Sequence, residues 1–525
     1  MKKAFPLLLS LLCLQLTTTA AEKIEADICV YGGTAAGVVA SVQAARMGKS
    51  VVLLEFGRHL GGMTSGGLSQ TDIGNKAAIG GISLEFYQRM GKHYGTNEAW
   101  KLEPSVAESV LRDFIREEKI PVHFDQHLAS VKKKDGRITE IKMENGNVVR
   151  AKEFIDATYE GDLMAKAKVS YHVGREANSV YNETINGIRE QTPKHQFLVA
   201  VDPYKTPGDP KSGLLTYIQK DELGKPGDGD HTVQAYNFRM CITQNKTNQI
   251  PITPPSDYDA SRFELLARYL EARIAAGQTP KLTEIMHIQP MPNGKTDINN
   301  NGGFSTDFIG ANYDYPDADY KQRAKIWKAH ENYTRSFFHF LATSPRVPES
   351  MRKDMQSWGL CKNEFTDTGG WPHQLYVREA RRMISDYVMN ENDCRAKRVA
   401  EDSIGLAAYN MDSHNCRRLV RFGHAENEGD VQVAPNKPYA ISYRSLVPKQ
   451  SQCENLFVPV CLSSSHAAYG SIRMEPVFML LGQSAATAAA HAIDENVPAQ
   501  KIDYPKLRAR LLADKQVLEW QTPKR

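Results

Sequence analysis

The chain has 525 residues, of which 41% are hydrophobic and 24% charged, and its formal net charge is +4. A chain of this length exceeds the usual size of a single hydrophobic core, so we expect two domains. Lysine and arginine alternate with acidic residues and form no basic stripe, so no nucleic-acid partner is expected.

Residues 1–21 have the pattern of a signal peptide. Lys2 and Lys3 precede an apolar run that ends at Leu16, and the small-residue sequence TTTAA follows. This order predicts cleavage before Glu22 and export to the periplasm or the extracellular space, with the net charge falling to 4 − 2 = +2. A membrane anchor is the alternative, but the run is too short to span a bilayer. A lipoprotein signal at Cys13 would need a small residue in place of Leu12.

The chain has 8 cysteines, and removal of Cys13 with the signal peptide leaves 8 − 1 = 7. No C-x-x-C pair occurs, so we expect neither a thioredoxin-type motif nor a structural zinc site, and we predict no metal site. Export would permit disulfides, although spacing does not define their pairing. We expect most of these cysteines to be buried, with Cys29 inside the first strand.

The stretch from Asp27 to Glu55 predicts a dinucleotide-binding βαβ unit. It reads DICVYGGTAAGVVASVQAARMGKSVVLLE: a strand, a glycine-rich turn, a helix of small residues, and a strand that ends in a carboxylate. In such a unit glycines permit the tight turn and the close approach of the helix, the helix N-terminus binds pyrophosphate, and the acid binds ribose. Thr34 replaces the usual middle glycine, and similar turns also occur in doubly wound proteins without a dinucleotide. The predicted binding residues are Gly32, Gly33, Thr34, Ala35, Ala36, Gly37 and Glu55.

Further along the chain, helical spacing at 84–90 and 106–117 gives way to alternation over residues 121–157. With turns at Asp135-Gly136 and Asn145-Gly146, this predicts a β-meander that ends in a buried strand. The chain from about 170 to 435 is rich in loops, with helices predicted at 262–276 and 321–342, and KTDINNNGGFSTDF is predicted to form mostly turns. A strand at 455–461 and a helix of small residues from about Pro476 resume the earlier pattern.

Six motifs carry a resemblance to a known family: GGTAAGVVAS, LGGMTSGGL, FIDATYEGDL, VGREANSVYNETINGI, WPHQLYVREARRM and SSSHAAYGSIRMEP. With them the chain resembles the secreted bacterial FAD-dependent oxidoreductases, which are related to fumarate-reductase flavoproteins and have a FAD-binding fold of the glutathione-reductase type. The resemblance implies an α/β fold. Residues 22–169 and 436–525 would form a Rossmann-like FAD-binding domain with a β-meander insertion, and residues 170–435 an inserted mixed α+β substrate or cap domain. Tyr159, where a glycine is usual, and Cys461 depart from the pattern.

The resemblance also implies that the cofactor is FAD and that the helix near Pro476 directs its positive end toward the flavin. It adds these predicted cofactor contacts: Gly61, Gly62, Met63, Val131, Asp162, Gly470, Ser471, Ile472 and Gln483. No second nucleotide fingerprint lies between a strand and a helix, so NAD(P)H is not expected. Electrons would then come from the substrate and pass to an acceptor that the sequence does not specify.

Oxidation of an alcohol requires a base, and His466 is the first choice, followed by His373 and then His424. Each histidine also has a purely structural interpretation. Arg378, Arg381 and Arg382 are predicted to lie on one helix, where Arg378 would bind an anionic or polyhydroxylated substrate or pair with a nearby acid. Arg473 lies in the cofactor-proximal motif and is the stronger candidate for binding the substrate.

The predicted function is that of a FAD-dependent dehydrogenase or oxidase that takes a hydride from a hydroxylated small molecule, such as a sugar or sugar acid. The alternatives are a flavin-containing polysaccharide lyase, a reductase of the fumarate-reductase type, and a non-catalytic binding protein that retains FAD. Reduction of the flavin by a ligand would distinguish a dehydrogenase or oxidase from the lyase and the binding protein, because both of these would leave the flavin oxidised.

Overall fold

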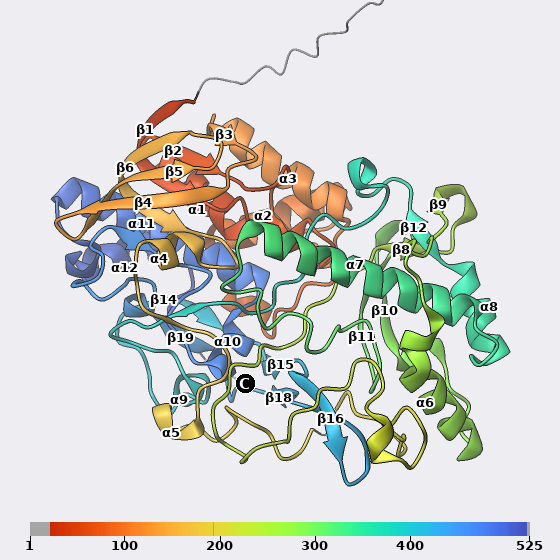
Figure 1. Ribbon diagram of the computed structural model, residues 1–525. Coiled ribbons are helices and arrows are strands. Elements are labelled where there is room, and N and C mark those ends of the chain that lie inside the picture. Colours follow the sequence, from red (N-terminus) through yellow and green to blue (C-terminus); the bar gives the residue numbers. More distant parts are fainter. Residues whose placement is uncertain (1–20, 193, 522–525) are drawn as a thin grey trace, which may run out of the picture.

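The computed structural model describes residues 21–192 and 194–521, so the predicted signal peptide lies almost wholly outside them (Figure 1). Its first layer is a seven-stranded sheet in the order β3-β2-β1-β6-β5-β4, in which β20 also pairs with β6. The bounds are β1 (Lys23–Tyr31), β2 (Val51–Leu54), β3 (Val122–His123), β4 (Leu128–Lys134), β5 (Arg137–Met143), β6 (Val148–Asp156) and β20 (Leu456–Phe457).

The sheet combines a parallel core with an antiparallel meander. Strands β3, β2, β1, β6 and β20 pair with one another in parallel, and Ile28 lies opposite Val51. Strands β4, β5 and β6 pair antiparallel, as the alternating pattern predicts. Because β20 pairs with β6, the chain returns to its first sheet after about 300 residues. The strand predicted at 455–461 is shorter than expected.

The helices of this part are α1 (Ala35–Arg46), α2 (Gly81–His93), α3 (Pro104–Glu117), α4 (Asp162–Lys166), α10 (His466–Ile472), α11 (Glu475–Glu495) and α12 (Tyr504–Ala513). Helices α1, α4 and α11 contact the sheet, α2, α3 and α12 pack on α1 or α11, and α10 packs against the middle region. The predicted helix of small residues is α11, and Pro476 lies in its first turn. A Cβ on Gly482 would lie 2.3 Å from the Ala36 oxygen, so a glycine is required for the close contact of α11 with α1. Among the described helices, α11 alone is long and apolar enough to cross a membrane, but 89% of its most apolar window is buried. No membrane span is therefore indicated.

The chain between these parts is rich in loops and short strands. Its helices are α5 (Asn178–Tyr181), α6 (Glu264–Ala275), α7 (Tyr320–Thr343), α8 (Glu349–Ser357) and α9 (Glu391–Cys394). Its strands are β7 (Tyr171–His172), β8 (Ile242–Thr243), β9 (Gln249–Ile250), β10 (Met286–Pro290), β11 (Thr296–Asn300), β12 (Gly359–Cys361), β13 (Arg382–Met383), β14 (Ser403–Ala407), β15 (Met411–Ser413), β16 (Arg417–Arg421), β17 (His424–Glu428), β18 (Val431–Val433) and β19 (Tyr439–Ser442). The two helices predicted here are confirmed as α6 and α7, and α7 runs from beside the sheet toward α8 (Figure 1).

Two predictions for this middle region are wrong. Part of KTDINNNGGFSTDF is strand β11, paired with β10, because Asp297 is buried against Arg239 and does not face solvent in a turn. The three arginines at 378–382 do not share a helix: Arg378 and Arg381 lie in irregular backbone, and Arg382 begins β13. Each arginine binds a different distant carboxylate, and these contacts outweigh the local helical pattern.

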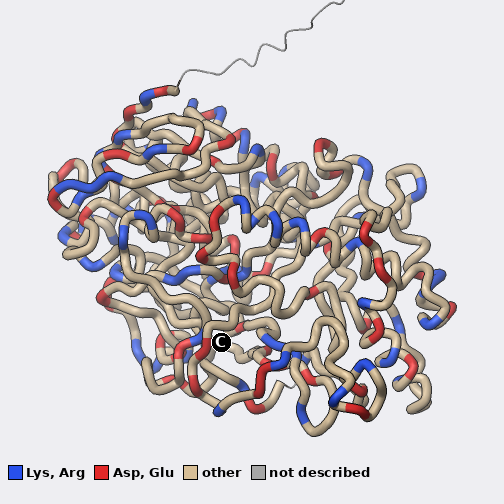
Figure 2. Tube along the Cα trace, in the orientation of Figure 1, with Lys and Arg blue, Asp and Glu red and all other residues tan. Residues whose placement is uncertain are grey.

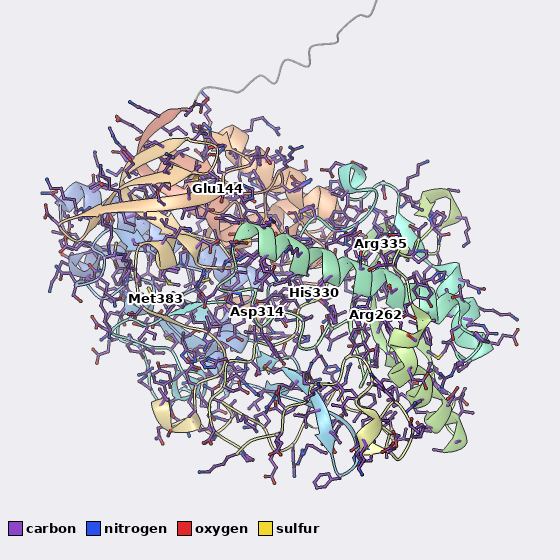
Figure 3. All side chains as sticks on the ribbon, in the orientation of Figure 1. Glu144, Arg262, Asp314, His330, Arg335 and Met383 are labelled. Atoms are coloured by element: carbon purple, nitrogen blue, oxygen red, sulfur yellow. The ribbon has the colours of Figure 1, made fainter. Side chains whose placement is uncertain are left out.

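Basic and acidic residues are interspersed along the described part of the chain (Figure 2). This distribution agrees with the absence of a basic stripe from the sequence. All seven cysteines of the described chain are buried, and the Sγ atoms of Cys241 and Cys361 lie 3.5 Å apart across β8 and β12. Side chains fill most of the space between the ribbon elements (Figure 3).

Candidate active site

The loop between β1 and α1 has the geometry of a pyrophosphate cradle. Gly32 has a φ of +107°, and a Cβ on Gly37 would lie 1.9 Å from the Gly32 oxygen, so no larger residue fits at position 37. The Thr34 hydroxyl donates to the Ala157 oxygen (2.7 Å) and accepts from the Gly37 nitrogen (3.3 Å). Thr34 therefore caps α1 and ties it to the end of β6, which explains how the loop tolerates a threonine here. Ala35 and Ala36 begin α1, whose first N–H groups have no intrahelical acceptors and can bind phosphate.

Glu55 follows β2 at the same edge of the sheet. Its carboxylate accepts hydrogen bonds from the Gly33 and Gly57 nitrogens, each at 2.6 Å. Burial raises the pKa of Glu55 to about 7, although both hydrogen bonds act in the opposite direction. A buried carboxylate beside the cradle is suited to accept the hydrogen bonds of a ribose diol. Together with the loop glycines, it fits a dinucleotide.

A cavity of about 350 Å³ opens next to this edge. The sheet side contributes Tyr31, Phe56 and Asp162, while α7 supplies the opposite wall. Burial would raise the pKa of Asp162, but the guanidinium groups of Arg323 and Arg381 hold it below its ordinary value. Val131, predicted to contact the cofactor, is half-buried on β4 opposite Ile141 and does not line this cavity.

The second glycine loop lies between the cradle and the N-terminus of α11. Gly61 and Gly62 both have positive φ, and the Met63 nitrogen donates to the Tyr159 hydroxyl oxygen (2.8 Å). The Tyr159 hydroxyl in turn donates to Glu475 (2.7 Å), the first residue of α11. Tyr159 thus replaces the usual glycine with a side chain that joins the loop to the helix. Burial raises the pKa of Glu475 to about 7.

The remaining predicted cofactor contacts have other neighbours. Gly470, Ser471 and Ile472 belong to the buried helix α10. Gly470 packs against the backbone of Asp412, and the Ser471 hydroxyl donates to the Tyr409 oxygen. Gln483 accepts from the Ile82 nitrogen (2.8 Å) at the start of α2. Helices α10 and α11 thus use these four residues to pack against other elements, and their contact with the cofactor stays a prediction.

A buried group, which we call the arginine cluster, lies beside the second glycine loop. Its members are Arg239, Asp297, Asp307, Tyr376, Arg378, Asp412, His414 and Arg473. Arg239 binds Asp297 with two hydrogen bonds (2.7 and 2.8 Å), and Asp297 also accepts from the Ser69 and Gln70 nitrogens. The cluster is therefore attached directly to the loop that follows Gly67.

Two arginines of the cluster lie over one tyrosine ring. The guanidinium carbons of Arg378 and Arg473 are 4.6 and 5.7 Å from the centroid of Tyr376. Arg473 also donates to the Tyr376 hydroxyl (2.9 Å) and to Asp412. The Nε atoms of both arginines are buried and have no hydrogen-bond partner within the described chain. The structure thus brings together two of the predicted substrate-binding residues, although they are almost 100 positions apart in the sequence.

His414 is the histidine of this cluster, and sequence reasoning missed it. Its Nδ1 lies 2.7 Å from Asp307, and its Nε2 lies 3.9 Å from Asp412. Burial, followed by the Arg378 charge, lowers the pKa of His414 to about 3, so the ring is neutral near pH 7. The carboxylate of Asp307 favours the tautomer with the proton on Nδ1 and leaves Nε2 able to accept a proton. No local motif around Asp412-Ser413-His414 signals this arrangement.

Glu475, directly before Pro476, was also missed, but it could have been found from its place at the start of a predicted helix.

The predicted bases lie elsewhere. His466 begins α10, where its Nδ1 is 2.7 Å from Glu379 within a group of ion pairs that includes Arg382 and Glu176. Burial, followed by the Arg382 charge, lowers the pKa of His466 to about 3. His373 stacks on His59 near α3, and His424 is partly exposed beside Glu426. None of these three histidines makes a hydrogen bond to the arginine cluster within the described chain.

The sheet, the cradle and the buried carboxylate define a dinucleotide-binding protein of the Rossmann-like class. The sequence match then gives the family: residues 27–511 match the FAD dependent oxidoreductase family. The match covers most of the chain, so the chain belongs to this family, is an FAD-dependent enzyme and uses FAD as its cofactor.

Comparison with curated proteins gives no match. Solved structures similar to part of the chain include a 3-ketosteroid-Δ4-(5α)-dehydrogenase from Rhodococcus jostii RHA1 (17% identity, TM-score 0.20, covering 28% of this chain and 50% of that one). An L-amino acid deaminase from Proteus vulgaris has 13% identity and a TM-score of 0.22, with 26% and 54% covered. A thioredoxin reductase from T. acidophilum has 22% identity and a TM-score of 0.19, with 30% and 40% covered. The chain thus spans about half or less of these structures, and the family assignment rests on the sequence match.

Proposed function

We propose that this oxidoreductase is a dehydrogenase or oxidase that takes a hydride from a hydroxylated small molecule with an acidic group, such as a sugar acid. The observation that carries the proposal is the placement of Arg378 and Arg473 over one Tyr376 ring, each with a buried Nε that has no partner within the described chain. Buried guanidinium groups bind carboxylates strongly. Predicted export would place the enzyme where glycans occur.

FAD supplies the acceptor for the hydride. The remaining chemistry belongs to the arginine cluster. Arg378 and Arg473 hold the acidic group of the substrate, whose negative charge offsets the Arg378 charge that lowers the pKa of His414. With the substrate bound, the Nε2 atom of His414 accepts the hydroxyl proton. Asp307 holds the other nitrogen of His414 at 2.7 Å and stabilises the imidazolium that forms. We therefore take His414 as the base in place of His466, whose neighbours are Glu379 and Arg382.

The test is anaerobic mixing of the flavoprotein with sugar acids, neutral sugars, polyols and amines while the oxidised flavin absorption is followed. We expect sugar acids to bleach the flavin. His414→Asn should slow bleaching by roughly 10²–10⁴-fold with FAD still bound, and Arg473→Gln should weaken substrate binding by roughly 10–100-fold. His424→Asn is the control, because that residue is partly exposed and outside the cluster.

Three results would overturn all or part of this assignment. Bleaching only by a low-potential donor, followed by reoxidation with an unsaturated acid, would identify a reductase of the fumarate-reductase type, which the same two arginines would also suit. An unsaturated product formed without bleaching would identify a lyase. Bleaching that is lost in His466→Ala and retained in His414→Asn would return the role of base to His466.

A further inference from the structure

Three potential metal ligands meet where the first part of the chain touches the middle region. His59 lies in the loop after β2, Glu108 on α3, and His373 in the segment that follows Trp371. Each offers one ligand atom, and these atoms all lie within 4.8 Å of one another. The three residues are far apart in the sequence, which is why no metal-binding spacing is visible there.

The hydrogen bonds around His59 match the surroundings of a metal-bound imidazole. Its Nδ1 lies 3.0 Å from Glu108 Oε2, and its Nε2 lies 2.9 Å from Asp367 Oδ2. A metal-bound histidine usually donates its second N–H to a carboxylate, which fixes the ring. The other oxygen of Glu108 is already occupied by Arg112 and the Leu60 nitrogen, so Oε2 is the oxygen left for a ligand bond.

The surroundings of His373 give separate support for a metal site. Its ring is stacked on that of His59, with centroids 3.8 Å apart, and both of its nitrogens are buried without a hydrogen-bond partner within the described chain. Arg335 on α7, labelled in Figure 3, stacks on Trp371 at 4.1 Å and holds this segment in place.

We propose that His59, Glu108 and His373 bind one divalent transition-metal ion, of which zinc fits best, with water at the remaining position and Asp367 orienting His59. Two imidazoles and a carboxylate are a common zinc ligand set, and three protein ligands leave one position open. Tetrahedral zinc places its ligand atoms roughly 3.3 Å apart, so the most distant ligand atoms would have to approach each other by up to about 1.5 Å. Because the rings of His59 and His373 are stacked at an angle of 6°, one ring would also have to rotate so that its nitrogen lone pair points at the ion. The ion would join the loop that leads to Gly61 to the middle region.

The test uses the full-length flavoprotein, treated with a chelator and then titrated with Zn²⁺ and, separately, with Co²⁺. We expect one equivalent of either metal to bind, the visible absorption of tetrahedral Co²⁺ to develop, and Zn²⁺ to raise the melting temperature. His373→Ala should abolish all three signals. Asp367→Asn should weaken binding by roughly 10–100-fold. His424→Ala is the matched control, since His424 also lies beside a carboxylate (3.1 Å) but belongs to no such group.

The proposal would be overturned if the protein bound no stoichiometric ion, or if His373→Ala bound the ion unchanged. His59 would then serve only to link the two carboxylates that it contacts, Glu108 and Asp367. Because His59 is next to the FAD-binding loop, His59→Ala is less informative if the variant does not fold. His373→Ala and Glu108→Gln together keep the test decisive. Metal content and melting temperature do not depend on turnover, so the result is independent of the proposed substrate.

Discussion

The nucleotide-binding part and the middle region stabilise their interiors in different ways. In the first, glycine and alanine allow backbone to approach backbone, as at Gly37 against Gly32 and Gly482 against Ala36. In the second, arginine and carboxylate side chains pair inside the protein. Arg175 binds Glu428 (2.8 Å) and Arg382 binds Glu176 (2.8 Å), with all four side chains at most 5% exposed.

This difference shows how a region with little regular secondary structure can hold a defined shape. A buried ion pair contributes little net stability, because both charges lose hydration, but leaving one partner alone is strongly unfavourable. Each pair therefore selects one arrangement of loops. Buried ion pairs also hold the arginine cluster together, where Arg378 pairs with Asp307 and Arg239 pairs with Asp297. In this protein the middle region supplies most of the charged groups around the proposed substrate.

The largest effect is expected from adding one methyl group to the cradle. In Gly37→Ala, the new Cβ would lie 1.9 Å from the Gly32 oxygen, so α1 must move away from the loop. We expect a loss of more than about 4 kcal/mol in the free energy of unfolding and no bound FAD, measured by denaturation and flavin absorption.

Gly48→Ala is the matched control for this substitution. Gly48 has a φ of +73° with no heavy atom within 4 Å of an added Cβ, so only the backbone conformation is penalised, by about 1 kcal/mol. Equal losses in the two variants would show that close packing at Gly37 is not the reason for the glycine.

The next effect tests the ion pairs of the middle region. Arg175→Met removes the close partner of Asp230 and leaves Glu428 paired with Arg417 alone (3.0 Å), and we expect a loss of about 3–5 kcal/mol in the free energy of unfolding. Arg46→Met removes a pair near the surface, with side chains about one-third exposed, and should cost no more than about 1 kcal/mol. Adding Glu428→Gln to Arg175→Met should recover part of the loss. A small effect of Arg175→Met would mean that these pairs do not organise the region.

The same contrast explains how much of the structure the sequence predicts. Gly32, Gly37, Glu55 and Pro476 act through neighbours within one βαβ unit or one helix, and local patterns placed them correctly. The arginine cluster joins residues such as Arg378 and Asp307, and the local spacing of arginines wrongly indicated a helix there. Such pairs depend on the path of the whole chain, so a single sequence does not reveal them, and His414 was missed for this reason.

The smallest predicted effect concerns Glu55 and separates its role in stability from its role in binding. The pKa of Glu55 is about 7 in the folded, FAD-free protein against an ordinary value of 4.5, so the folded state binds more protons between these values. Stability should therefore fall as the pH rises from 4.5 to 7, by up to about 3 kcal/mol from this group.

Glu55→Gln should remove this pH dependence of the stability of the FAD-free protein. It should also weaken FAD binding by roughly 10–100-fold, because the ribose loses a charged hydrogen-bond acceptor. Unfolding of FAD-free samples across the pH range, together with FAD titration, measures both effects. Glu153→Gln is the control: burial raises the pKa of Glu153 to about 8, its partner is Arg137 on β5, and Glu153 makes no hydrogen bond to the cradle within the described chain. That variant should also flatten the pH dependence but leave FAD affinity unchanged. If Glu55→Gln binds FAD as tightly as the original protein, Glu55 serves only to hold the Gly33 and Gly57 nitrogens in place.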